Sequence, residues 1–235
     1  MTRRYLIVPQ IGEVVLAKRR GSRNIRLSIN AAGQVRVGMP PWTPYEAGVL
    51  FVKRHQYWIQ KQLLAHSPKQ LADGSRIGKL HRLTYINKPP ANGLVEARLS
   101  SSKIMVKTAL EPMNPAVQKK VVQACEKALR QQSELLLPRR VEAVSRKYNL
   151  PYSGLKIRKL TSRWGSCSRK KEITLSYFLI QLPWQLIDYV ILHELAHTVF
   201  HNHSRNFWSF MEERLPNLVD LKKQIKTHKP RIEPY

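Results

Sequence analysis

The sequence contains little cysteine and no long apolar segment. Its two cysteines, Cys125 and Cys167, do not form a C-x-x-C pair and suggest no disulfide framework, which favours a reducing cytoplasm. We expect both to be small, buried hydrophobic residues. No stretch reaches the run of about eighteen apolar residues that a transmembrane helix needs, and the N-terminal segment lacks the apolar core and cleavage site of a signal peptide. A membrane-embedded or disulfide-stabilised secreted protein is therefore not expected.

Acidic residues are also scarce. The chain of 235 residues has 15 acidic residues against 41 lysines and arginines, which gives a formal net charge of +26. Such a charge favours anionic partners, which include nucleic acids, nucleotides and membrane surfaces. The basic residues are scattered in short groups, however, so a solvated basic surface without a partner is the alternative hypothesis. The sequence gives no indication of an oligomeric state.

The first part of the chain, residues 1–110, has the pattern of a β-rich region with one helix. Apolar and polar residues alternate at 24–30 and at 34–39, which predicts a β-hairpin. A helix that starts at a proline is predicted over residues 44–64. Further strands are expected between residues 75 and 108. We find no internal repeat in the sequence.

The rest of the chain predicts an α+β domain over residues 111–228 and a loose C-terminal tail over 229–235. A long helical region opens this domain, and Pro138 is expected to kink or divide it, because proline lacks the amide hydrogen and crowds the preceding turn. Two strands follow, the second of them predicted over residues 172–180. Shorter helices complete the domain, the first beginning near Pro183.

The segment HELAHTVFHNH, residues 193–203, contains four of the chain's eight histidines. His193 and His197 bracket Glu194 in an H-E-x-x-H pattern. Residues four apart lie on one face of a helix, so both imidazoles can bind one metal ion, at about 2.0–2.1 Å for zinc. Glu194 can then accept a proton from a metal-activated water. Histidines that are merely packed or solvated are the alternative, but ionisable groups on a buried helix need a reason. The same helix is expected to bury an apolar stripe: Ile187, Ile191, Leu195 and Val199.

The third metal ligand can be His201 or His203. If the helix continued to His201, this residue would lie about 12 Å beyond His193 along the axis, and the two could share a tetrahedral metal only with strained side chains. A turn after Phe200 or His201, with Asn202 in the left-handed conformation, would instead bring His203 back to the helix. The spacing therefore favours His203 as the ligand and leaves His201 to line the cleft.

The segment RWGSCSRKKEITLSYFLIQLPWQLIDYVILHELAHTVFHNHSRNFW resembles the YgjP-like, or WLM, zinc metallopeptidase family, which is related to SprT-like proteases. That family joins a W-G-S-C turn, a strand, a proline-started helix with H-E-L-x-H, and N-H-S-x-x-F-W, and every element occurs here. The resemblance implies a zincin-like core, in which an active-site helix packs on a small β-sheet. It also implies one zinc ion per chain, held by His193, His197 and His203, with Glu194 as the catalytic base.

The resemblance also suggests where a substrate would bind. In zincins the edge of a strand beside the active-site helix lines the substrate cleft, and residues 172–180 are the candidate strand. Arg163 can contact the substrate, whereas Trp164 is expected mainly to anchor the core and Gly165 to form a tight turn. Three residues are candidates for stabilising an oxyanion: Tyr177, His201 and Arg205. The remaining histidines are expected on the surface: His55, His66, His81 and His228.

These features favour a zinc-dependent hydrolase, above all a metallopeptidase that acts on peptides. The basic composition leaves two alternatives open. One is hydrolysis of a nucleotide or another phosphoanhydride by the same chemistry, and the other is DNA-associated, SprT-like proteolysis with nucleic acid held on the basic surface. A nucleic-acid-binding module with a purely structural zinc fits less well, because structural sites usually have four protein ligands.

Overall fold

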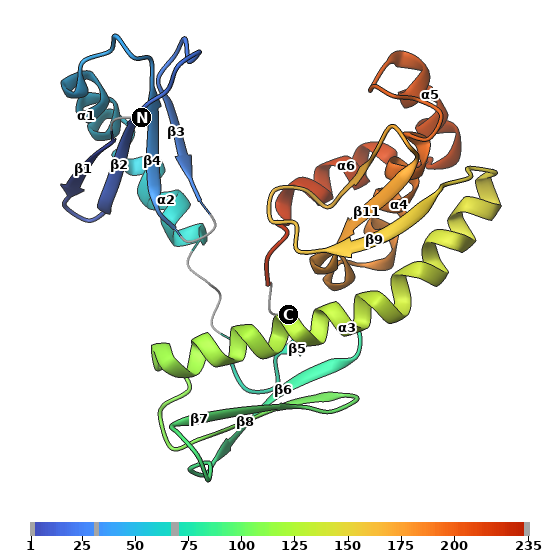
Figure 1. Cartoon of the computed structure of the whole chain (residues 1–235), viewed down its shortest axis with the longest axis horizontal. Helices are drawn as coiled ribbons and strands as arrows, with labels where there is room; N and C mark the ends of the chain where they lie inside the picture. The colour runs from blue at the N-terminus through green and yellow to red at the C-terminus, as the bar shows by residue number, and fades with distance from the viewer. Residues whose placement is uncertain (1–2, 31–32, 67–70, 233–235) are drawn as a thin grey trace. The chain divides into compact units, whose positions relative to one another are not determined.

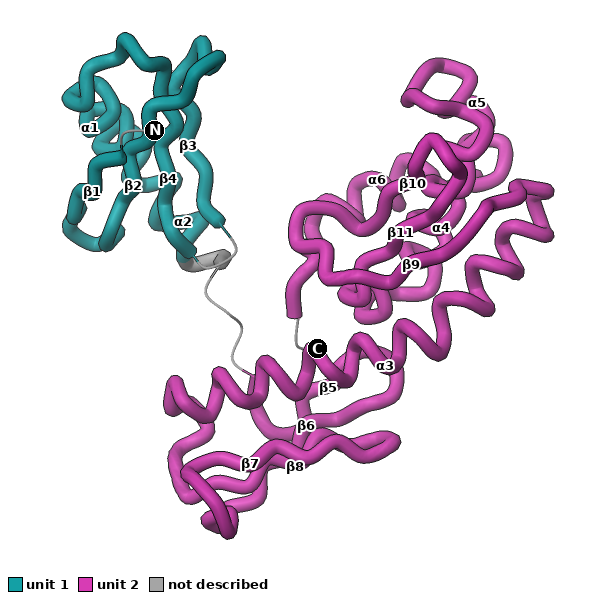
Figure 2. The backbone as a smooth tube through the Cα atoms, viewed as in Figure 1, with its two compact units in different colours: residues 1–68 teal, residues 69–235 magenta. Residues whose placement is uncertain are grey.

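The computed structural model describes residues 3–30, 33–66 and 71–232, without the side chains of 64–66. The chain forms two compact units, residues 1–68 and 69–235 (Figure 2). The sequence pattern suggested a boundary near residue 110. The structure instead groups the strands between 76 and 108 with the C-terminal half, because their apolar side chains share one core with the helices that follow.

Unit 1 is a four-stranded sheet with two helices (Figure 1). Its elements are β1 (Arg3–Val8), β2 (Gly12–Lys18), β3 (Arg26–Ile29), β4 (Val35–Met39), α1 (Tyr45–Arg54) and α2 (Gln56–His66). The strand order is β1-β2-β4-β3, with β2 and β4 parallel and the outer pairs antiparallel. The predicted hairpin is confirmed, since Ile29 lies opposite Val35. The single helix expected over 44–64 is wrong: His55 separates α1 from α2, and its Nδ1 donates to the carbonyl of Phe51 at 2.9 Å.

The strands of unit 1 bury one face. Alternate residues of the sheet, among them Val14, Leu16 and Val37, pack against Val52 of α1 and Ile59 of α2. The intervening residues therefore point to the opposite face, because successive side chains of a strand alternate. Neither helix of unit 1 covers that second face, which carries basic residues together with some apolar ones.

Unit 2 begins with a second four-stranded sheet, made of β5 (Arg76–Ile77), β6 (His81–Asn87), β7 (Val95–Leu99) and β8 (Lys103–Thr108). Its order, β5-β6-β8-β7, and its strand directions repeat those of the sheet in unit 1. The absence of an internal repeat, expected from the sequence, is thus wrong at the level of topology. The two segments share alternating apolar residues and the sequence R-L-S, at 26–28 and 98–100, which is too short to mark a repeat by itself.

His81 was expected on the surface and is instead buried at the start of β6. Its Nε2 donates to the carbonyl of Ser100 at 2.9 Å, and its Nδ1 accepts from Nε2 of Gln132 at 2.7 Å. His55 and His228 are half-buried. The side chain of His66 lies outside the described residues.

A long helix, α3 (Pro115–Tyr148), packs on β7 and β8 and on the elements that follow it. Asn114 caps its start, because Asn114 Oδ1 accepts from the amide of Ala116 at 2.9 Å. Pro138 does not divide the helix, which continues through it as one curved element (Figure 1). The helix thereby joins the second sheet and the C-terminal elements into one core.

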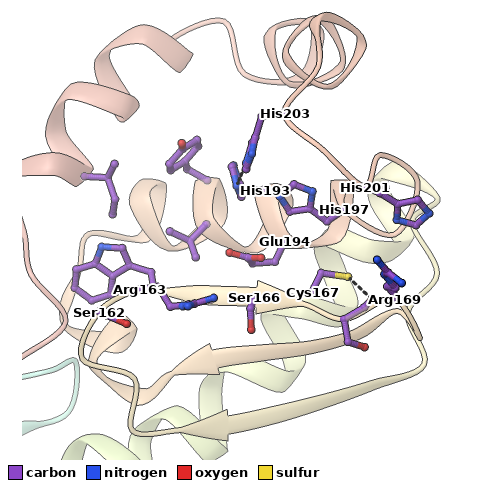
Figure 3. Close-up of a pocket in the computed structure, with 16 residues that line it drawn as sticks. Ser162, Arg163, Ser166, Cys167, Arg169, His193, Glu194, His197, His201 and His203 are labelled. Carbon is purple, nitrogen blue, oxygen red and sulfur yellow. Dashed lines mark hydrogen bonds between the residues drawn. The ribbon is translucent and has the colours of Figure 1, made fainter. Parts of the chain in front are cut away.

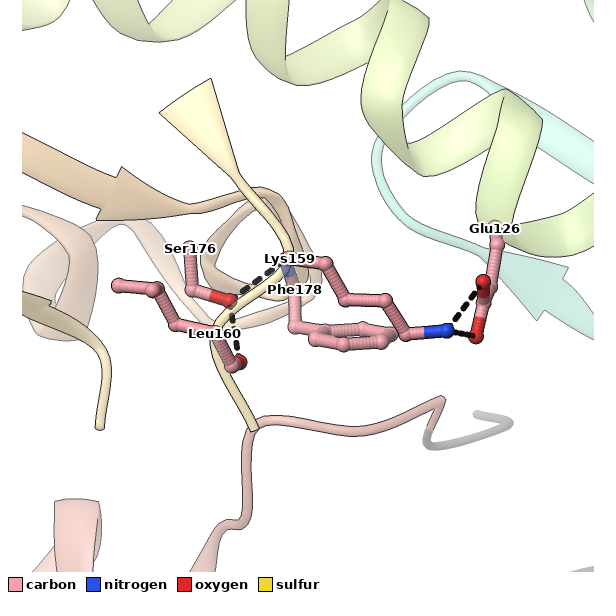
Figure 4. Close-up of polar contacts among 5 residues, drawn as sticks. All are labelled: Glu126, Lys159, Leu160, Ser176 and Phe178. Carbon is pink, nitrogen blue, oxygen red and sulfur yellow. Dashed lines mark hydrogen bonds and ion pairs between the residues drawn. The ribbon is translucent and has the colours of Figure 1, made fainter. Parts of the chain in front are cut away.

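The third sheet comprises β9 (Gly154–Arg158), β10 (Gly165–Cys167) and β11 (Glu172–Ser176), in the order β10-β11-β9. The strand predicted over 172–180 therefore ends at Ser176, and a 3-10 turn, η1 (Tyr177–Gln181), follows. It was also the candidate edge strand, but β11 is paired on both sides, and β10 is the edge strand that contacts α4. Ser176 explains the early end, because its Oγ donates to the carbonyl of Leu160 and accepts from the amide of Phe178 (Figure 4).

An ion pair fixes the segment after β9 to α3. Lys159 Nζ lies 2.6 and 2.7 Å from the two carboxylate oxygens of Glu126 (Figure 4). Both side chains are partly exposed, so their main effect is to orient the chain rather than to stabilise it strongly. The loop that leads into β10 therefore begins from a defined position.

Three helices complete unit 2: α4 (Trp184–Ala196), α5 (Arg205–Arg214) and α6 (Leu218–Thr227). No helix among the described residues is long and apolar enough to cross a membrane. The tail expected to be loose packs over its first residues, since Pro230 is buried and the carbonyl of Arg231 accepts from Gln181 Nε2 at 2.8 Å. Residues 233–235 lie outside the described part of the chain.

Candidate metal centre

Helix α4 carries His193 and Glu194 of the H-E-x-x-H pattern, and His197 is its C-cap residue. It begins after Pro183, as predicted, and its fully buried Ile187, Ile191 and Leu195 fix it in the core of unit 2. Val199 was expected to continue this stripe but is exposed, because the helix ends at Ala196. The burial of three side chains on one face therefore presents the adjoining face, with the histidines, to a cavity.

The chain turns directly after α4, earlier than the sequence suggested. The amide of Phe200 still bonds to the carbonyl of Ala196 at 2.9 Å, but the helix goes no further. Asn202 is not in the left-handed conformation that was expected there. Its Oδ1 instead accepts from the amide of Ser204 at 3.2 Å, and Ser204 Oγ in turn caps the start of α5. Side-chain hydrogen bonds thus replace backbone strain in the turn.

This turn brings His203 to the two histidines of the helix. One ligand atom from each of His193, His197 and His203 lies within 4.8 Å of the others. The Nε2 atoms of His193 and His203 are 3.0 Å apart (Figure 3). Imidazole nitrogens that bind zinc tetrahedrally at about 2.0–2.1 Å are roughly 3.3 Å apart, so the triad fits one such ion. Three nitrogen ligands leave the fourth position open, as in catalytic rather than structural sites.

The surroundings of the triad keep its nitrogens available for a metal. His197 Nδ1 donates to the carbonyl of Phe200 at 2.8 Å, which directs its unprotonated Nε2 to the other imidazoles. Burial lowers the pKa of His193 to about 3, with smaller contributions from His197 and His203, so this ring is neutral. Aromatic rings hold the triad in place: Phe207 stacks on His197, with centroids 4.8 Å apart.

Glu194 lies in the wall of the same cavity, with 8% of its surface exposed. Burial raises its pKa to about 7, and the positive charge of Arg163 opposes this shift. Glu194 packs against Gly165 of β10, where a Cβ would come within 2.7 Å of the glutamate Cγ. Gly165 therefore does not form the tight turn expected from the sequence; it lies in a strand and makes room for the carboxylate.

A cavity of about 840 Å³ opens beside the triad (Figure 3). Its walls are α4 and the turn after it, the strand β10 and the loops on either side of β10, with Ile225 contributed by α6. Besides the triad and Glu194 it is lined by polar and basic side chains, which include Ser166, Arg163 and Arg169. The chemistry of the lining suits a polar substrate that presents a carbonyl or an anionic oxygen to the open side of the triad.

Comparison with known families places the chain in one of them. A family model described as "YgjP-like, metallopeptidase domain" matches residues 23–228. The chain belongs to the YgjP-like metallopeptidase family. This confirms the family expected from the sequence, and membership indicates a metal-dependent peptidase, hence a hydrolase. No curated protein matches the chain. Among solved structures, the metallopeptidase zymogen of Pyrococcus abyssi abylysin is similar to it, with 26% identity over 37% of this chain and 89% of that chain and a TM-score of 0.35.

The further site residues expected for this YgjP-like chain are only partly brought together. Arg163 and His201 line the cavity. Tyr177 does not; it lies in η1, where its hydroxyl bonds to Glu126 and burial raises its pKa. Arg205, the first residue of α5, is exposed and also lies outside the cavity lining. Trp164 is half-buried against the core, as an anchor would be.

Tyr189 also lines the cavity and was not expected from the sequence. It lies one turn before His193 on α4, is almost completely buried, and contacts the His193 ring with centroids 6.0 Å apart. Burial raises the pKa of its hydroxyl, which therefore stays protonated and able to donate. The spacing of four residues from a candidate metal ligand was the signal that could have identified it.

Proposed function

We propose that this chain is a zinc-dependent peptidase in which His193, His197 and His203 hold one zinc ion and Glu194 is the general base. The observation that supports it best is that three imidazole nitrogens converge beside Glu194, a buried glutamate of α4. When bound, zinc supplies a Lewis acid that polarises a carbonyl and makes water acidic near neutral pH.

Glu194 moves the proton in this scheme. With a pKa near 7, its carboxylate can take a proton from the attacking water and later give it to the departing amine. The oxygen of the water forms a bond to the peptide carbon, and the C–N bond breaks. Gly165 allows the carboxylate to lie directly against the backbone of β10, because a Cβ at this position would come within 2.7 Å of the glutamate Cγ.

The edge strand β10 is the proposed substrate-binding strand. Ser168 N donates to Glu172 O and Ser176 N donates to Trp164 O, so the even-numbered residues of this stretch pair with β11. In an antiparallel ladder the alternate residues direct their amide and carbonyl groups outward. Gly165 and Cys167 therefore offer free backbone groups beside the cavity, to which an extended peptide can add as a further strand.

An oxyanion needs a hydrogen-bond donor near the open side of the triad. Among the candidates, Arg163 and His201 line the cavity, and Tyr189 joins them. Tyr189 is the most rigidly held of the three, because it is buried in α4 whereas the other two are exposed. We therefore propose Tyr189 as the main donor and Arg163 as a substrate contact.

The test combines metal analysis with a matched pair of variants. The purified protein should contain about one zinc per chain and cleave casein or a peptide library, and a chelator should abolish cleavage until zinc is restored. Glu194→Gln should keep the metal and lose turnover by about 10²–10⁴-fold. The control Glu213→Gln, at an exposed position on α5, should leave both unchanged. Activity retained in Glu194→Gln would refute the assignment of the base.

The basic lining of the cavity supports a second candidate, the hydrolysis of a nucleoside triphosphate. Arg163 and Arg169 are exposed to the cavity, and guanidinium groups suit phosphate oxygens. The same preparation should therefore be assayed with peptides and with nucleoside triphosphates. Release of phosphate or pyrophosphate that requires zinc and Glu194, without peptide cleavage, would favour this second function.

A further inference from the structure

A second basic groove lies in unit 1. A cavity of about 650 Å³ is bounded by the sheet and by the connection between β2 and β3. Its lining contains six arginines and no acidic residue: Arg3, Arg19, Arg20, Arg23, Arg26 and Arg36. All six are exposed. Unit 1 as a whole has eleven lysines and arginines against two acidic residues, so the electrostatic potential around it is strongly positive.

The strand register explains how the arginines come together. Arg3 lies opposite Ala17, Ala17 opposite Gly38, and Gly38 opposite Arg26, which makes one row across all four strands. The two central residues of this row, Ala17 and Gly38, are small, so the surface of the sheet is recessed there. An arginine stands at each end of the row. Arg36 lies in the next row on the same face. The other side of the sheet holds the core, so this face is free of the unit's own helices.

The positive charges of this groove are not neutralised within unit 1. Among the described residues, none of the six arginines forms an ion pair with a carboxylate. Arg36 Nε donates to the neutral amide oxygen of Gln34 at 3.0 Å, which positions the guanidinium without cancelling its charge. The single acidic residue on this face, Glu13, accepts from Gln34 Nε2 at 3.2 Å and does not line the groove. Unpaired, oriented guanidinium groups are suited to phosphate oxygens.

Exposed apolar side chains lie on the same face. Tyr5 is 62% exposed and Ile7 is 83% exposed, although both are large hydrophobic residues in β1. Tyr5 lies opposite Val15, which lies opposite Arg36, so the ring belongs to the same row as one of the arginines. An exposed aromatic ring on the same face of an open sheet as guanidinium groups can stack on an unpaired base while the guanidinium groups contact phosphates.

We propose that this face of unit 1 binds single-stranded nucleic acid, with the arginines on the phosphates and Tyr5 stacked on a base. A duplex would satisfy the arginines but not Tyr5, because its bases are stacked on one another inside the helix. The groove shares no residue with the metal centre. Two of its strands, β1 and β2, also lie before residue 23, where the family match begins. Such a site would bring the peptidase to proteins bound on single strands.

The experiment uses the full chain and a fluorescently labelled single strand of about twelve nucleotides, as RNA and as DNA, with anisotropy measured over a range of salt. The variant Arg3→Gln/Arg26→Gln/Arg36→Gln should weaken binding at least about tenfold near 0.15 M salt. It should also reduce the slope of log K against log salt by about 2, since each phosphate contact on a single strand contributes about 0.7. Tyr5→Leu should weaken binding about fivefold or more, and Tyr5→Phe should restore it.

A matched control removes equal charge from the other side of unit 1. Lys53, Arg54 and Lys61 are exposed on α1 and α2, and their combined replacement by glutamine should change the affinity and slope little. If both triple variants lost the same affinity for the single strand, binding would depend on net charge alone, and the proposal would be overturned. So would tighter binding of a duplex than of the single strand, or no effect of Tyr5→Leu. Zinc content and peptidase activity should be unchanged in every variant, which separates this site from the proposed function.

Discussion

The carboxylate of Glu194 lies directly against the backbone of Gly165, with room for a hydrogen but not for a methyl group. A Cβ at position 165 would lie 2.7 Å from Glu194 Cγ and 2.9 Å from its Oε1. Because β10 is held by its pairing with β11, Gly165→Ala should displace the glutamate rather than the strand. We expect kcat for a peptide to fall about 100-fold, as for a catalytic group moved by about 1 Å, with zinc content unchanged.

The same sheet offers a control for this substitution. Gly154 lies in β9, and a Cβ there would meet Glu172 Cγ only at an ordinary 3.7 Å. Gly154→Ala should therefore retain full activity. If Gly165→Ala were as active as the wild type, with its glutamate still in place in a crystal structure, the steric argument would be refuted.

The third metal ligand is tested by comparing two neighbouring histidines. His203→Ala should lower zinc affinity by more than roughly 100-fold, which exceeds the effect of losing a partner that only orients a ligand. His201→Ala should retain zinc, because His201 lines the cavity but is not part of the triad. Competition with a chromogenic chelator measures the zinc affinity of both variants. Loss of zinc from the His201 variant alone would show that the turn after α4 differs from the one described.

Local spacing made the most secure part of the site predictable. His193 and His197 are one helical turn apart, so their common direction follows from the backbone geometry alone. The selection of His203 over His201 followed from the rise of a helix per residue, which would place His201 about 12 Å beyond His193 if the helix continued. The means of turning was not predictable, because Asn202 and Ser204 form side-chain hydrogen bonds where a left-handed residue was expected.

The parts of the fold that were mispredicted depend on neighbours distant in sequence. The edge position belongs to β10 because three residues of that loop pair with β11, and nothing in a three-residue stretch signals pairing. His81 is buried because Gln132, 51 residues away, hydrogen-bonds to it. The unit boundary lies near residue 68 because the second sheet packs on α3. Each is a tertiary contact, which alternation and helical periodicity do not encode.

The two cysteines should differ sharply in reactivity. Burial raises the pKa of Cys125 to about 12, so almost none of it is thiolate at pH 8, and it should react with a thiol reagent only after unfolding. Cys167 is partly exposed in the cavity and should react in the folded protein. Counting modified thiols by mass spectrometry, before and after denaturation, distinguishes them. Rapid modification of Cys125 in the native protein would contradict its burial in α3.

Cys167 also reports on the charge of Glu194. Burial raises the pKa of this thiol, and the negative charge of the glutamate raises it further. In metal-free protein, Glu194→Gln removes that charge, so the pKa of Cys167 should fall and its alkylation at pH 8 should accelerate, because the thiolate is the reacting species. Glu213→Gln, which changes an exposed residue of α5, should have no such effect. An unchanged rate would place the two groups further apart than the cavity indicates.

Gln132 should be among the most important single residues for the stability of unit 2. Its buried amide accepts from the backbone amides of Lys79 and Leu80, at 2.7 and 3.0 Å, and donates to Ile77 O at 3.0 Å. Gln132→Ala leaves these buried groups, and the His81 ring, without a partner, so we expect the free energy of unfolding in urea to fall by about 2–4 kcal/mol. The neighbouring Gln131 is exposed, and Gln131→Ala should change the free energy of unfolding by less than about 0.5 kcal/mol. Equal stabilities of the two variants would mean that the turn between β5 and β6 finds other partners and does not depend on α3.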